Sequence, residues 1–101
     1  MKTFRTKDLA MEFYKECMLI KIKKYNVQDQ FERASLSVLL NITEGAGRTT
    51  RKDRRKFYSI AMASLRETQV ILEIMNRNEL FNKSDKLAAH IYKLMQNPGG
   101  S

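Results

Sequence analysis

The feature that most constrains the fold of this chain is the near absence of glycine and proline from its interior. Between residues 5 and 97, only Gly45 and Gly47 interrupt the sequence. No segment alternates apolar and polar residues in the way that a half-exposed strand does. Because turn residues are confined to one place and strand patterns are missing, the chain is predicted to be all-α.

Apolar residues recur at helical spacing in four segments, which sets the predicted organisation. The expected helices run from about Lys7 to Tyr25 with Thr6 as N-cap, from about Asp29 to Glu44, from about Arg51 to Asn76 with Thr50 as N-cap, and from Ser84 as cap to about Met95. Gly45 is expected to close the second helix in the left-handed conformation. Short connections then predict an up-down-up-down four-helix bundle over residues 1–96, followed by a disordered tail or expression remnant at 97–101.

Positive charge is concentrated directly after the two glycines. The formal net charge is +8, and the segment 48–56 carries six basic residues against the single acid Asp53. We call these six the cationic cluster: Arg48, Arg51, Lys52, Arg54, Arg55 and Lys56. Such a patch predicts a polyanionic partner, with nucleic acid ahead of an anionic membrane. Lys21 and Lys24 are candidate extensions of the same surface, and Tyr58 either stacks on a base or packs at the bundle edge.

Residues for metal or catalytic chemistry are scarce. With one cysteine, Cys17, and one histidine, His90, neither a zinc site nor a di-iron helical bundle is expected. We therefore expect no metal, no cofactor and no enzymatic activity. The lone cysteine and the absence of a signal peptide are consistent with a reduced cytoplasmic setting, and no apolar run approaches the ~18 residues of a membrane span.

Polar residues within the helical pattern predict a polar core. Ser37 and Asn41 lie four apart on nearly the same face of the second helix, which suggests close helix approach around hydrogen bonds. Glu44 and Glu67 are interpreted as partners of arginines, with Arg33 as the internal candidate. The third helix is longer than the fourth, so its second half is expected to pack on a neighbouring subunit.

Two blocks of residues resemble a known family. The first reads Gln30-x-x-Arg33-Ala34-x-x-Ser37-Val38-x-x-Asn41-Ile42-x-Glu44-Gly45-x-Gly47-Arg48, and the second Phe57-x-x-x-Ala61-x-x-Ser64-Leu65-x-Glu67. They resemble the bacterial four helix bundle protein family, often encoded within intervening sequences of 23S ribosomal RNA genes. The resemblance implies a non-enzymatic bundle that assembles into a ring, commonly a pentamer. It also implies mainly architectural roles at the matching polar positions, Arg33, Ser37, Asn41, Glu44, Ser64 and Glu67.

The accessory protein of diversity-generating retroelements is similar in fold and binds both nucleic acid and a reverse transcriptase; this is a fold-level analogy. Two hypotheses about function therefore stay open. In the first, a ring-forming basic bundle binds RNA, or other nucleic acid, through the cationic cluster. In the second, the protein is a scaffold that docks an acidic partner such as a reverse transcriptase or a ribosomal assembly.

Overall fold

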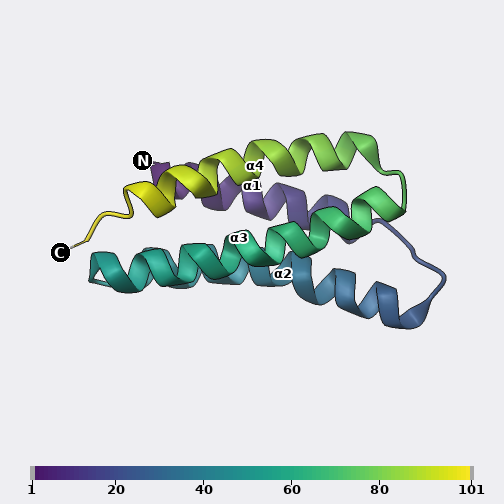
Figure 1. Ribbon diagram of the computed structural model, residues 1–101, viewed down its shortest axis with the longest axis horizontal. Helices are drawn as coiled ribbons and strands as arrows, with labels where there is room; N and C mark the ends of the chain where they lie inside the picture. Colours follow the sequence, from purple (N-terminus) through teal and green to yellow (C-terminus); the bar gives the residue numbers. More distant parts are fainter. Residues whose placement is uncertain (1, 101) are drawn as a thin grey trace.

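The computed structural model describes residues 2–100 and shows an up-down-up-down bundle of four helices (Figure 1). The helices are α1 (Lys2–Cys17), α2 (Tyr25–Gly47), α3 (Arg51–Ile74) and α4 (Asn78–Gln96). Contacts join α1 to α2, α2 to α3, α3 to α4 and α4 back to α1, which closes the bundle. The molecule measures 45 × 23 × 17 Å, so its two ends are well separated. The predicted fold class is confirmed.

The core consists of one apolar stripe from each helix. Its members are fully or nearly buried and include Phe13, Phe31, Val38, Ile42, Leu65, Leu72, Leu87 and Ile91. Burial of this apolar surface is the main stabilising contribution to such a bundle. Among residues 2–100, no helix is both long and apolar enough to cross a membrane.

The first two helices differ from the predicted bounds. α1 begins at Lys2, so Thr6 is a buried residue inside the helix and not its N-cap. α1 ends at Cys17, and the connection 18–24 is held by the side chain of Gln28. The Gln28 Oε1 atom accepts a hydrogen bond from the Ile22 N–H at 2.6 Å, and its Nε2 donates to the Ile20 carbonyl at 3.4 Å. These long-range bonds satisfy backbone groups that a longer helix would have satisfied itself.

The α3–α4 connection is much shorter than predicted. Asn76 has a positive φ of 56°, the Asn76 N–H donates to the Glu73 carbonyl, and the Arg77 N–H donates to the Leu72 carbonyl. This pair of bonds is a Schellman motif with Asn76 as its left-handed residue. α4 therefore starts at Asn78, and Ser84 is a buried residue within it, not its cap.

Two further features differ from the sequence prediction at the other end. Gly45 lies within α2, which continues to Gly47, and its φ is not positive. An ideal Cβ at Gly45 would lie 2.7 Å from Cε1 of Tyr58, so this glycine allows close approach of α2 and α3 and does not end the helix. Residues 97–100 lie against the start of α3, with Pro98 buried and Gly100 beside the Thr49 carbonyl. Ser101 lies outside the described residues.

Tyr58 is fully buried and cannot stack on a base, which rules out one of its two predicted roles. Its hydroxyl has no hydrogen-bond partner among the described residues. A buried hydroxyl without a partner carries a desolvation cost of ~1–3 kcal/mol. Tyr58→Phe should therefore raise the free energy of unfolding by about 1 kcal/mol, measured by urea denaturation.

Ser84→Ala is the matched control, because it removes a buried hydroxyl that does have partners. The Ser84 Oγ donates to the Phe81 carbonyl and accepts from Nε2 of Gln69 at 2.8 Å. This variant should lose about 1 kcal/mol or somewhat more. A comparable loss in Tyr58→Phe would show that the Tyr58 hydroxyl is hydrogen-bonded after all.

Candidate nucleic-acid interface

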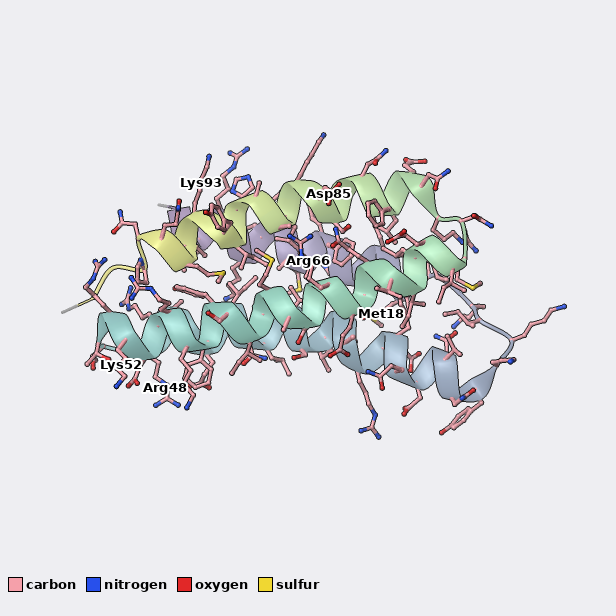
Figure 2. All side chains as sticks on the ribbon, viewed as in Figure 1. Met18, Arg48, Lys52, Arg66, Asp85 and Lys93 are labelled. Carbon is pink, nitrogen blue, oxygen red and sulfur yellow. The ribbon has the colours of Figure 1, made fainter. Side chains whose placement is uncertain are left out.

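The cationic cluster lies at the end of the bundle where α2 meets α3. Three residues, 48–50, connect the two helices. The Arg48 N–H closes α2 on the Gly45 carbonyl, and the Thr50 Oγ1 accepts a hydrogen bond from the Asp53 N–H at 3.1 Å, as its predicted N-cap role requires. Capping by this short hydroxyl fixes the start of α3. The tight connection gathers the cluster at one corner, where Figure 2 labels Arg48 and Lys52 side by side.

Two of the six cations hold the end of α4 and the segment that follows it. The Arg55 Nε donates to the Met95 carbonyl at 2.9 Å, and the Arg54 Nη1 donates to the Pro98 carbonyl at 3.2 Å while its Nε donates to the Arg48 carbonyl at 2.7 Å. The last carbonyls of a helix lack intrahelical donors and carry partial negative charge. Arg54 and Arg55 are therefore structural as well as cationic.

Arg48 and Lys56 surround the ring of Phe57. The Arg48 Cζ lies 4.8 Å from the ring centroid and the Lys56 Nζ 5.7 Å. Both distances are within the range of cation–π attraction. Arg48 also forms an exposed ion pair with Glu44, one turn earlier on α2, at 3.0 Å. Nothing in the sequence pattern marked Phe57 as part of this site.

Arg51 and Lys52 are the cations most available to a ligand. Both side chains are exposed in the first turn of α3, and neither has an ion pair or hydrogen bond among residues 2–100. A positive charge at a helix N-terminus is not favoured by the helix dipole. Folding therefore gives no evident reason for these two charges, whereas an anionic ligand would give one.

Lys21 and Lys24 do not join the cationic cluster. They belong to the α1–α2 connection, which lies at the opposite end of the bundle from the α2–α3 connection (Figure 1). The longest dimension of the molecule is 45 Å, several Debye lengths at physiological salt. Their prediction as an extension of one surface is wrong, because successive connections of an up-down-up-down bundle lie at opposite ends.

Three of the six polar residues expected in the core form one hydrogen-bonded group between α2 and α3. The hydroxyls of Ser37 and Ser64 lie 2.7 Å apart, across the two helices. The Asn41 Nδ2 donates to the Ser37 carbonyl at 2.9 Å and to its Oγ at 3.0 Å. Ser37 and Asn41 are only partly buried, so this group lies at the edge of the core.

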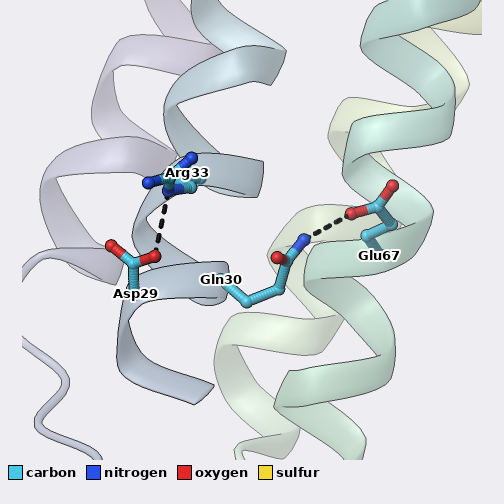
Figure 3. Close-up of polar contacts among 4 residues, drawn as sticks. All are labelled: Asp29, Gln30, Arg33 and Glu67. Atoms are coloured by element: carbon cyan, nitrogen blue, oxygen red, sulfur yellow. Dashed lines mark hydrogen bonds and ion pairs between the residues drawn. The ribbon is translucent and has the colours of Figure 1, made fainter. Parts of the chain in front are cut away.

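The other three residues lie on the surface. Glu44 pairs with an arginine as expected, but Arg33 pairs with neither glutamate among the described residues, and Glu67 has no arginine partner there. The Arg33 side chain is 76% exposed and pairs with Asp29 at 3.0 Å, and Glu44 pairs with Arg48. Glu67 accepts a hydrogen bond from Nε2 of Gln30 at 2.9 Å, which links α3 to α2 (Figure 3). Charged groups remain hydrated in these positions, which avoids the cost of burying them.

A second polar group, between α3 and α4, was not predicted. The Gln69 Nε2 donates to the Ser84 Oγ and to the Asp85 Oδ1, each at 2.8 Å. The sequence hint for this polar group is Gln69, which occupies a buried position in the apolar stripe of α3. Because Ser84 was assigned to a helix cap, no partner for Gln69 could be proposed.

The pKa values of Cys17 and His90 are shifted in opposite directions. Burial raises the pKa of the Cys17 thiol to about 12, with a smaller contribution from Glu16. Burial also lowers the pKa of His90, helped by the positive charges of Arg5 and Lys93. Across residues 2–100, no group of three or more His, Cys, Asp or Glu side chains is placed to hold a metal ion.

Comparison with known proteins identifies the family. Residues 4–97 match the family described as 23S rRNA-intervening sequence protein, so the chain belongs to it. A crystal structure of a protein of unknown function from the S23 ribosomal protein family of Bacteroides thetaiotaomicron is similar, with a TM-score of 0.86 and 21% identity. The alignment covers 96% of this chain and 100% of that one. No curated protein matches the sequence.

Proposed function

We propose that this member of the 23S rRNA-intervening sequence protein family is a non-enzymatic, cytoplasmic protein that binds nucleic acid, RNA in particular, through the cationic cluster. The observation that carries the proposal is the pair Arg51 and Lys52, which are exposed and have no anionic partner among the described residues. Arg48 and Lys56 flank them, and Asp53 is the only acid within the segment 48–56. Lysine and arginine gathered in this way bind phosphates by charge and release counterions from the nucleic acid.

Contacts of this kind position a nucleic acid and carry little sequence information. The proposal therefore expects affinity that depends on salt more than on sequence. Arg54 and Arg55 contribute to the electrostatic potential even though their Nε atoms bond to carbonyls, because a guanidinium has five donors and keeps its charge. We expect about three or four phosphate contacts, made by the exposed cations of the cluster.

Fluorescence titration of several unrelated RNAs and DNAs at two salt concentrations tests the proposal. Affinity should fall steeply between about 50 mM and 200 mM salt and should vary little between sequences. An absence of binding at the lower salt concentration would overturn it. The alternative, a scaffold that docks an acidic protein, would then be the better account of the same charges.

We also propose that the chain forms a homo-oligomeric ring, a pentamer by the family resemblance. Support comes from apolar side chains exposed on the outer face shared by α2 and α3. Val70 is 55% exposed and Ile74 is 68% exposed, and Leu40 and Ile60 are exposed on the same two helices. α4 is longer than predicted and still leaves these residues uncovered, so a second copy is the proposed cover. A ring would repeat the cationic cluster and raise affinity through avidity.

Replacing Val70 and Ile74 by glutamate should therefore convert the assembly to monomers while helicity is retained. Sedimentation or light scattering gives the mass, and circular dichroism gives the helicity. Tyr92→Glu is the control, because Tyr92 is equally exposed but lies on α4. A monomeric mass for the unmodified protein at micromolar concentration would contradict the ring.

A further inference from the structure

The aromatic ring of Phe57 lies against the cationic cluster, and phosphate binding by charge alone does not require it. Phe57 directly precedes the buried Tyr58 on α3 and is itself half-buried at the seam with α2. An ideal Cβ at Gly45 would lie 3.2 Å from the Phe57 Cβ, so the missing side chain at position 45 lets Phe57 pack closely on α2. Phe57 is partly exposed, and Arg48 and Lys56 both lie near its ring.

Arg48 is held in place over this ring from a second side. Its Nη2 lies 3.0 Å from the Glu44 Oε2, while its Cζ lies over the ring of Phe57 at 4.8 Å. A guanidinium held by a carboxylate and an aromatic ring is a flat surface of limited mobility. Its side chain is still 45% exposed, so a planar ligand can reach it.

The cations proposed to bind phosphates lie close to the Phe57 ring and the Arg48 guanidinium. Lys52 and Lys56 lie four residues apart and therefore on one side of α3, and Lys56 is the second cation near the Phe57 ring. Arg48 and Lys52 lie at the same end of the bundle, just after α2 and in the first turn of α3 (Figure 2). A nucleic-acid strand whose phosphates follow Lys52 and Lys56 would bring a neighbouring base to Phe57 and Arg48.

We propose that the cationic cluster is a site for single-stranded nucleic acid, in which an unpaired base stacks on the Phe57–Arg48 pair. The inference rests on the proposed nucleic-acid binding and names its substrate class. Aromatic rings and guanidinium planes bind unpaired bases in this way with little preference between them. A duplex keeps its bases stacked inside the helix, so it offers only its phosphates to the cluster.

An oligonucleotide with and without bases separates stacking from charge. The probes are a single-stranded RNA of about 12 nucleotides, within the usual range of site sizes, and a strand of the same length with abasic residues throughout. Both carry the same phosphates. The unmodified protein should bind the strand with bases about tenfold more tightly, the effect of one stacked base, whereas a fully paired hairpin should resemble the abasic strand.

Phe57→Leu should remove this tenfold preference, and it should change the affinity for the abasic strand much less, because every cation of the cluster remains. Arg48→Lys should reduce the preference while it keeps the charge, and it avoids the half-buried position where a substitution could unfold the protein. Tyr25→Leu is the control, because Tyr25 is an 83% exposed aromatic residue at the other end of the bundle. It should change neither affinity.

The outcomes distinguish the two proposals. Equal affinity of the unmodified protein for both strands would overturn the stacking site and leave charge-based binding intact. A preference that survives both Phe57→Leu and Arg48→Lys would place the base elsewhere and would equally overturn it. Failure to bind either strand at low salt would overturn the proposed nucleic-acid binding itself.

Discussion

Changing Arg51 and Lys52 together to glutamate is expected to lower the affinity for RNA by about 100-fold at low salt. Each is an exposed cation without an anionic partner among the described residues, so each can form a charge-assisted bond to a phosphate. The loss of two such bonds at ~1.5 kcal/mol each amounts to about 3 kcal/mol, or roughly 100-fold. The fold should not suffer, because acidic residues in the first turn of α3 are favoured by the helix dipole.

The matched control is the pair Lys21→Glu and Lys24→Glu. It removes the same amount of positive charge from the opposite end of the bundle. If net charge alone determined affinity, the two double variants would behave alike. We expect the control to bind RNA within a few-fold of the unmodified protein at the same salt concentration. Equal losses in both variants would contradict a localised site.

Gly45→Ala is expected to destabilise the bundle by about 1–3 kcal/mol, which is the usual cost of inserting a methyl group into a closely packed contact. The new Cβ would lie 2.7 Å from Cε1 and 2.9 Å from Cδ1 of Tyr58, and 3.2 Å from the Phe57 Cβ. Tyr58 is fully buried, so its ring cannot move aside without disturbing the packing of α2 on α3. Denaturation midpoints in urea measure the change.

Gly47→Ala provides the opposite result on the same helix. Gly47 is the last residue of α2, and an added Cβ would meet nothing within 4 Å. Alanine is favoured over glycine in a helix by roughly 0.5–1 kcal/mol, so this variant should be slightly more stable than the unmodified protein. Destabilisation of similar size at both positions would show that close approach of Tyr58 is not the reason for glycine at position 45.

The residues that could be predicted from the sequence are those governed by local pattern. The apolar stripes identify four helices because each helix buries one face, and the N-cap Thr50 follows from its spacing to Asp53. Helix ends elsewhere depend on hydrogen bonds and backbone conformations that the apolar pattern does not show. Gln28 holds the connection 18–24, and Asn76, not a glycine, takes the left-handed position after α3.

The candidate site was predictable in charge but not in geometry. A run of cations marks the cluster in the sequence, yet only the fold shows that Arg54 and Arg55 donate to carbonyls after and at the end of α4. The position of Lys21 and Lys24 at the far end follows from the up-down-up-down order of the helices. In the sequence, Phe57 fits the apolar stripe of the third helix and Tyr58 lies beside it. Helix packing decides that Tyr58 faces the core and that Phe57 lies between two cations.

Mapping of the RNA contact by NMR tests the central claim most directly. Single-stranded RNA would be added to protein labelled on its backbone amides, and the shift changes would be assigned to residues. The account predicts that the largest changes fall within residues 48–57, while residues 18–25 at the other end of the bundle stay unchanged. Changes centred on the α1–α2 connection, or no changes at low salt, would contradict a nucleic-acid site at the cationic cluster.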